Sequence, residues 1–269
     1  MIDVTTRPTV GNLLREWRHR RRLSQLDLAL EAGISARHLS FVETGRSRPS
    51  AEMVVHLAER LEVPLRERNG LLLAAGYAPA YAQHDLGAPE MGPVREALDQ
   101  LLRAHHPLPA VVVDRHWGLV AANDALALLV DGVAPHLLEA PVNVLRLSLH
   151  PEGMAPRIVN LRQWRAHLLD RLGRESVISG DPALAALHEE LAAYPGGGPA
   201  AAGAAASSEI AVPLRLRVRA QELAFISTVT TFGTAIDVTV SELSIESFFP
   251  ADEETSERLR ALAAEPGAS

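Results

Sequence analysis

The sequence of 269 residues contains no cysteine and no lysine, and each absence excludes a class of chemistry. Without cysteine the chain forms no disulfide, thiolate zinc site, thiol switch or flavin-thiol photoreceptor. Without lysine it has no lysine nucleophile or base, and a self-cleaving Ser-Lys dyad is impossible. All 26 basic residues are therefore arginine.

Long apolar runs are also missing. No run reaches the roughly 18 residues expected of a membrane-spanning helix. The first residues lack the apolar core of a signal peptide. We therefore expect a cytoplasmic protein with no membrane partner.

The sequence further lacks the motifs of common catalytic and metal centres. It has no His-Glu-x-x-His helix and no cupin-type histidine pair, and none of its 11 histidines stands out as a haem ligand. The three consecutive glycines at 196–198 have neither the spacing nor the flanking strand of a phosphate-binding turn. We therefore predict no catalytic residue and no metal ligand.

What the chain does have is an uneven charge distribution. Residues 1–80 carry 12 Arg against 9 Asp and Glu, whereas the remainder carries 14 against 24, and the net charge is −7. Only the first part is suited to a polyphosphate such as DNA. The length allows two domains, each with a sizeable core.

Residues 24–50 predict two short helices joined through a glycine. Ser24 can cap the first helix, with Asp27 three residues on, and Gly33 stops it. Ser35 caps the second helix, and Gly45 ends it. Such a helix-turn-helix can place its second helix in the DNA major groove.

The second helix presents the candidate base readers. Arg37 has a planar fork that spans guanine O6 and N7, so we predict that it reads a base. Ala36 could contact a thymine methyl, and His38 and Ser40 could reach a base or a phosphate. The alternative for each of these three residues is a surface position without a DNA contact. Further candidate phosphate contacts lie at or just beyond this helix: Ser35, Thr44, Arg46 and Arg48.

The remaining patterns predict a helical domain and a mixed domain. Three more helices are expected in 1–78, followed by a Pro-, Gly- and Ala-rich linker at 79–92. In 93–269 we expect helices at 93–104, 143–149, 155–173 and 182–193, and a further helix that residues 123–124 cap. Strands are expected at 109–114, 118–122, 210–218, 222–232 and 236–247. A low-complexity loop is expected at 195–208. The fold class is thus an all-α domain followed by an α+β domain with a five-stranded antiparallel sheet.

Specific motifs carry a family resemblance. The N-terminal set resembles the helix-turn-helix signature of the XRE family: Gln25, Leu28-Ala29, Ala32-Gly33, Ile34-Ser35, Leu39, Glu43, Gly45, Arg46 and Pro49-Ser50. A second set resembles the MmyB-like regulators within that family: residues 38–46, 145–151, 159–160, Trp164 and 246–252. This resemblance spans nearly the whole chain and implies a PAS-like ligand-binding domain at 93–269.

The resemblance also assigns roles in the helix-turn-helix. It implies an ion pair between Arg18 and Glu43 that braces the first helix against the recognition helix. It further implies that Gln25 anchors a DNA phosphate. Phe41 departs from the polar residue of some phage repressors, so packing is the expected role there.

For the second domain the resemblance implies a pocket between sheet and helices for an apolar small molecule such as a fatty acid. Candidate walls are Trp117, Leu147, Trp164, Phe225, Val229 and Phe248, each of which is otherwise ordinary core. Candidate anchors for a head group are Arg146, His150, Asn160 and Arg162, although a structural hydrogen bond is the commoner fate of His150. No other cofactor is expected.

These observations lead to a transcriptional regulator that binds double-stranded operator DNA as a homodimer and senses a small ligand. One recognition helix covers a half-site, which favours two copies about one DNA turn apart. A second hypothesis makes the C-terminal domain only a dimerisation or protein-interaction module with a filled core. A third hypothesis is an enzyme that the N-terminal domain attaches to DNA. The sequence shows no group of polar residues that would support catalysis.

Overall fold

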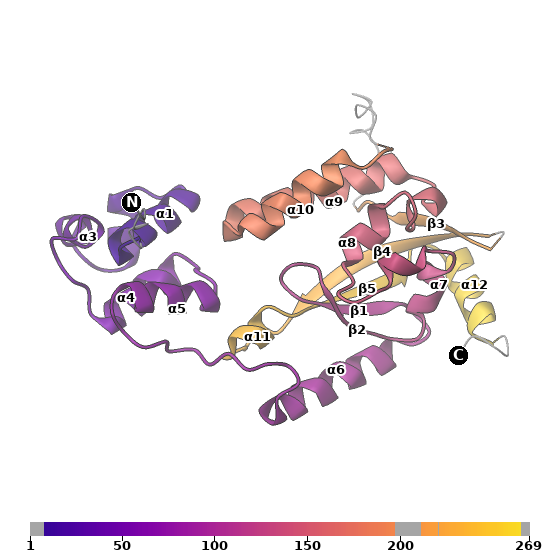
Figure 1. Ribbon diagram of the computed structural model, residues 1–269, viewed down its shortest axis with the longest axis horizontal. Coiled ribbons are helices and arrows are strands. Elements are labelled where there is room, and N and C mark those ends of the chain that lie inside the picture. The colour runs from indigo at the N-terminus through magenta and orange to yellow at the C-terminus, as the bar shows by residue number, and fades with distance from the viewer. Residues whose placement is uncertain (1–7, 197–210, 220, 265–269) are drawn as a thin grey trace, which may run out of the picture. The chain divides into compact units, whose positions relative to one another are not determined.

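The computed structural model describes residues 8–196, 211–219 and 221–264, and these form two compact units (Figure 1). The N-terminal unit runs to His84 and also includes Val177–Ser179 and Thr234–Ser241. The C-terminal unit contains the rest of the described chain. The boundary at His84 falls inside the predicted linker 79–92. Most of the predicted loop 195–208 lies outside the described residues.

Five helices make up the body of the N-terminal unit. They are α1 Val10–Arg20, α2 Gln25–Glu31, α3 Ala36–Glu43, α4 Ala51–Arg60 and α5 Leu65–Ala74. Their apolar faces share one core, in which Leu14, Leu28 and Leu39 are fully buried. Burial of leucine side chains contributes about 1.5 to 3 kcal/mol each, and this holds short helices together that would be marginal alone.

Local signals set the helix ends of the helix-turn-helix as predicted. The Ser24 side chain accepts from the backbone N–H of Asp27, whose carboxylate accepts from the N–H of Ser24, a complete capping box. Gly33 follows with φ +64°, a left-handed conformation that glycine adopts without a Cβ penalty. Ser35 then caps α3 through the N–H of His38. The all-helical N-terminal domain is therefore confirmed.

A five-stranded antiparallel sheet forms the centre of the C-terminal unit, in the order β2-β1-β5-β4-β3. The strands are β1 Ala110–Val113, β2 Leu119–Ala122, β3 Leu214–Val218, β4 Gln221–Thr231 and β5 Ser244–Pro250. In β3, side chains point alternately to the two faces of the sheet. Leu214, Leu216 and Val218 therefore lie on the buried face, and the intervening arginines lie in solvent.

Helices cover both faces of this sheet (Figure 1). Helix α6, Gly92–His105, packs on one face, where Leu98 and Leu102 meet Ala110, Val112 and Ile245. The other face carries the larger core. The elements associated with it are α7 Leu126–Val130, α8 Val144–Leu149, the 3-10 turn Ala155–Arg157, α9 Leu161–Ser179, α10 Pro182–Ala193 and α12 Glu253–Ala264. Short 3-10 turns also occur at Pro89–Met91 and Pro135–Leu137. The mixed, PAS-like fold class is thus confirmed.

Three local predictions were wrong. The expected strand 236–247 begins instead with α11, Val238–Ser241, because the Asp237 carboxylate accepts the N–H groups of Thr239 and Val240 and so caps a helical turn. The expected helix 155–173 is interrupted at 158–160, where the N–H of Val159 donates to the carbonyl of Arg215 in β3.

The third error concerns Asn123, which was expected to cap the helix that follows β2. Its side chain instead accepts from the N–H of Ala110 and donates to the carbonyls of Leu102 and Leu108. It therefore ties α6 to the start of β1. Among the described residues, no helix is both long and apolar enough to cross a lipid bilayer.

Candidate functional site

A buried ion pair fixes the position of the recognition helix α3. The Nε and Nη2 atoms of Arg18 on α1 donate to the two carboxylate oxygens of Glu43 at 2.7 and 2.9 Å. The side chain of Glu43 has no exposed surface, and that of Arg18 is 8% exposed. The pair implied by the family resemblance is therefore confirmed, and it joins the first helix to the end of α3.

The carboxyl group of Glu43 stays ionised, because its hydrogen bonds and the nearby positive charges favour the ionised form more than burial disfavours it. Burial alone would raise the pKa of Glu43. Hydrogen bonds from Arg18 and Gln25, with the charges of Arg18 and Arg15, instead hold that pKa below its usual value. Arg15 also donates to the backbone carbonyl of Glu43 at 3.2 Å. Negative charge at this point thus organises three side chains around the end of α3.

A close backbone contact beside this pair depends on glycine. A Cβ atom at Gly11 on α1 would lie 2.5 Å from the carbonyl oxygen of Val42 and 2.7 Å from that of Glu43. Both atoms belong to the backbone of α3, so neither can swing away. Glycine therefore lets α1 approach the recognition helix at a distance that any side chain would prevent.

Replacing Gly11 with alanine is expected to lower the free energy of unfolding of the N-terminal unit by about 1 to 3 kcal/mol, because α1 must move away from α3. Amide hydrogen exchange over α1–α5 would measure the loss. Gly70→Ala is the matched control, since its nearest neighbour, Glu67 Oε2, is 4.0 Å away. That change should stabilise α5 by about 0.5 to 1 kcal/mol. Equal effects of the two changes would contradict the close-contact argument.

Two guanidinium groups lie over one aromatic ring of α3, one from α3 itself and one from the loop that follows it. The Arg37 guanidinium carbon lies 5.3 Å from the centroid of Phe41, and that of Arg46 lies 6.0 Å from it. Both arginines are exposed. Phe41 thus acts as a packing platform, in agreement with its predicted role, and it limits where the two charges can go.

The other predicted DNA contacts occupy mixed environments. Ala36, His38 and Ser40 are half-buried on α3, and Ala36 packs against the core. The hydroxyl of Thr44 donates to the carbonyl of Ser40 at 2.7 Å, so part of its hydrogen-bonding capacity serves the helix end. Each assignment stays a prediction.

Two predicted phosphate contacts have intramolecular partners. Gln25 donates to Glu43 Oε2 at 2.8 Å, which holds its amide beside the N-terminus of α2. Arg48 donates to the carbonyl of Ala75 at 2.9 Å and lies over the ring of Tyr77. Arg48 therefore connects the loop after α3 to the end of α5, a structural role that the sequence did not reveal.

The C-terminal unit contains a small cavity of about 40 Å³ between the larger core face of the sheet and α7, α8 and α9. Its walls come from segments far apart in the sequence. The lining residues are Val111, Leu126, Leu129, Val144, Leu145, Leu147, Ser148, Met154, Trp164, Leu168, Leu214, Glu246 and Phe248. All but Ser148 and Glu246 are apolar, so the cavity suits an apolar molecule.

Three of the predicted wall residues, Leu147, Trp164 and Phe248, line this cavity. Two others lie elsewhere: Phe225 is fully buried in the core beside Phe248, and Val229 is 40% exposed on β4. Trp117 is buried, and its indole N–H donates to Glu175 at 2.9 Å. The cavity therefore brings together only part of the predicted set.

The four predicted head-group anchors, Arg162 among them, are not among the lining residues. Arg146 pairs with Glu190 at 2.7 Å on the surface. His150 Nδ1 accepts from the N–H of Glu152, the structural hydrogen bond considered as its alternative role. Asn160 donates to the carbonyl of Pro213 and accepts from the N–H of Arg215, which joins the start of α9 to β3.

Sequence reasoning missed both polar residues of the cavity. Ser148 Oγ accepts from the indole N–H of Trp164 at 3.1 Å. Glu246 is 5% exposed on β5, and burial raises its pKa, an effect that Arg171 and a hydrogen bond from Ser227 only partly offset. A glutamate two residues before Phe248, on the same face of a strand, was the available signal.

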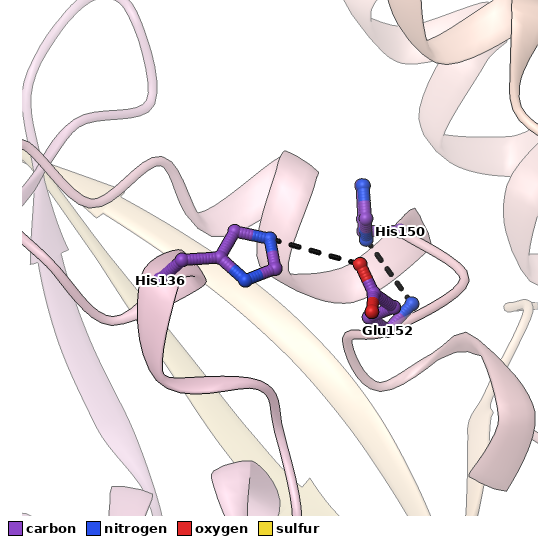
Figure 2. A group of neighbouring side chains, drawn as sticks. All are labelled: His136, His150 and Glu152. Carbon is purple, nitrogen blue, oxygen red and sulfur yellow. Dashed lines mark hydrogen bonds and ion pairs between the residues drawn. The ribbon is translucent and has the colours of Figure 1, made fainter.

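Three potential metal ligands, His136, His150 and Glu152, gather at the surface, with ligand atoms within 4.8 Å of one another (Figure 2). His136 Nε2 lies 3.9 Å from Glu152 Oε2. His150 Nδ1 accepts a backbone N–H, so the proton of the neutral ring is on Nε2. A ligating histidine instead donates its second ring nitrogen to an acceptor. We infer no metal site from this cluster.

A braced helix-turn-helix and a separate sheet domain with an apolar cavity define a ligand-sensing transcription regulator. Comparison with protein families agrees: residues 94–262 match the MmyB-like transcription regulator ligand binding domain, and residues 14–68 match a helix-turn-helix model of XRE type. The chain therefore belongs to the MmyB-like transcription regulators. These are families of regulators rather than enzymes.

Other comparisons add little. No curated protein matches the chain. The crystal structure of the clp gene regulator ClgR from Corynebacterium glutamicum is 23% identical over 36% of this chain and 90% of its own, with a TM-score of 0.22. An RNA-binding light-oxygen-voltage receptor is 15% identical over 94% of this chain and 64% of its own, with a TM-score of 0.28. Scores this low establish no common arrangement.

Proposed function

We propose that this protein is a sequence-specific DNA-binding regulator that acts as a homodimer on a twofold operator and whose C-terminal unit senses an apolar small molecule, for which a fatty acid is one candidate. The DNA-binding part of this proposal rests on the exposed N-terminal end of α3, a helix that the ion pair between Arg18 and Glu43 holds in place. A recognition helix fixed in this way can present Arg37 to base edges without first becoming ordered.

Changing Arg37 to alanine is expected to weaken binding to the preferred operator by about 1 to 3 kcal/mol and to blur the choice of sequence. Arg46→Ala is the matched comparison, because its guanidinium lies over the same Phe41 ring and is also exposed. As a phosphate contact, Arg46 should lower affinity on all duplexes alike and reduce the salt slope by about 1. Fluorescence anisotropy with selected and random duplexes separates the two results. A uniform loss for Arg37→Ala would assign Arg37 to the backbone.

The ligand-sensing part of this proposal rests on the apolar lining of the cavity. One water needs about 10 to 15 Å³ of such space, so a cavity of 40 Å³ holds a few waters and no acyl chain. An apolar ligand must therefore displace wall side chains as it enters. That displacement provides the difference between two states on which any ligand-driven shift depends.

Native mass spectrometry of the full-length protein from cells tests ligand binding. A co-purifying apolar molecule that disappears after delipidation would support the sensor. The same spectra report whether the protein is a dimer. Repeated absence of any bound mass would favour the second candidate, a dimerisation or interaction module, which the small volume of the cavity also favours.

A further inference from the structure

Among the described residues that line the cavity, Glu246 carries the only charged side chain. It lies on the central strand β5, between Val111 of β1 and Val229 of β4 in the register. Its side chain is 7% exposed. An ionisable group in apolar surroundings is costly to bury, and a hydrogen bond from Ser227 and the charge of Arg171 offset only part of that cost for Glu246.

Arg171, the cation that pairs with Glu246, also interacts with several other side chains. Arg171 Nη1 is 3.5 Å from Glu246 Oε1, at the outer limit of a hydrogen bond. The same guanidinium contacts Glu175 Oε1 at 3.1 Å and stacks over Trp117 at 4.3 Å from the ring centroid. Arg171 does not belong to the cavity lining, and none of the lining residues is basic. A ligand in the cavity therefore meets the carboxyl group of Glu246, whose cationic neighbour Arg171 lies outside the lining and is shared with Glu175.

This arrangement selects the polar group of the ligand. A carboxylate next to Glu246 would place two negative charges in an apolar enclosure, where like charges repel strongly and one of them must take up a proton. A hydroxyl has neither difficulty, because a carboxyl group accepts its hydrogen bond in both protonation states. With an ionised Glu246 the bond is charge-assisted and stronger.

We propose that the cavity binds an apolar molecule with an uncharged hydrogen-bond donor, such as a long-chain alcohol, and that Glu246 accepts the hydrogen bond of that group. The inference rests on the proposed sensing function and narrows its ligand class, because it puts an uncharged alcohol in the place of an ionised fatty acid. Ser148, the other polar residue of the lining, offers a second hydroxyl to the same group. An anionic head group at this end of the ligand is rejected by Glu246.

The test compares 1-decanol with decanoate at pH 8, by isothermal titration calorimetry with the full-length protein. The two probes have the same chain length, so the burial of their apolar surface largely cancels. Wild-type protein should bind 1-decanol about tenfold or more tightly than decanoate. Part of that ratio arises from desolvation of the free carboxylate, so the wild-type ratio alone does not identify Glu246.

The decisive variant is Glu246→Gln, which keeps the shape and removes the charge. Its ratio of decanol to decanoate affinity should fall about tenfold, mainly through tighter decanoate binding. Glu190→Gln is the control, because it removes a carboxylate from the surface pair with Arg146 and should leave the ratio unchanged. If circular dichroism shows that Glu246→Gln does not fold, Glu246→Met provides the same comparison.

The outcomes separate this inference from the proposed function. An unchanged ratio in Glu246→Gln, or tighter binding of decanoate by the wild type, would overturn the role of Glu246 while the cavity remains a ligand site. If the wild type binds neither probe, the proposed sensing of apolar molecules fails, and the inference fails with it. A ratio that falls in Glu246→Gln and persists in Glu190→Gln supports the assignment.

Discussion

Replacing Glu43 with leucine is expected to lower the free energy of unfolding of the N-terminal unit by about 3 to 5 kcal/mol. The change leaves the guanidinium of Arg18 buried without its carboxylate, and it also removes the acceptor that Gln25 uses. A charge stranded in this way costs more than the pair itself contributes, because desolvation offsets most of the attraction between the partners. Residue-resolved amide hydrogen exchange across α1–α5 would measure the loss.

The double variant Arg18→Met with Glu43→Leu distinguishes a stranded charge from lost packing. It removes both charges and keeps apolar volume between α1 and α3, so most of the lost stability should return. If the double variant is as unstable as Glu43→Leu alone, the ion pair makes a large net contribution of its own. Binding to operator DNA by the double variant would then show whether the pair also sets the angle of α3.

Replacing Trp164 with alanine is expected to lower the stability of the C-terminal unit by about 3 to 5 kcal/mol. The indole is 3% exposed, bonds Ser148 through its N–H, and stacks on His167 with ring centroids 5.6 Å apart. Its removal joins the volume of the indole to the existing cavity. Added indole should therefore refill the space and restore stability, by about 2.7 kcal/mol at a concentration 100 times its Kd.

Leu191→Ala is the comparison for this rescue. Leu191 is fully buried but does not line the cavity. Its truncation should cost about 2 to 5 kcal/mol and leave a space too small for indole. Thermal unfolding with and without indole provides the measurement. If indole fails to stabilise Trp164→Ala, the walls collapse when the side chain is removed, and the space left by the indole ring does not hold an apolar molecule.

Much of the local structure could be predicted from the residues alone. The capping box at Ser24, the cap at Ser35 and the glycine at 33 act over three or four positions, so they determine where α2 and α3 begin and end wherever the chain is placed. Helix α10, Pro182–Ala193, has the predicted bounds for the same reason: Asp181 caps it and proline stands at its first position.

Prediction failed where specific hydrogen bonds compete with the pattern of apolar residues. Apolar alternation near Ile236, Val238 and Val240 favours a strand, but the side chain of Asp237 caps a short helix there. Residues 158–160 have helical neighbours, yet Ile158 forms a β-bridge with Leu216 and the N–H of Val159 donates to the carbonyl of Arg215, which interrupts the helix. In both cases hydrogen bonds outweighed a weak local preference.

The sequence by itself determined that the chain has a helix-turn-helix with arginine at its exposed tip and a mixed second domain, and the family resemblance implied the pair between Arg18 and Glu43. The tertiary structure alone decided that Glu246 and Ser148 face a common cavity, and that Arg146, His150 and Asn160 are not part of its lining. The physical reason is range. Caps and periodicity act between residues a few positions apart, whereas a cavity forms where side chains from β1, α8, α9 and β5 fail to fill the space between them, which depends on the packing of the entire domain.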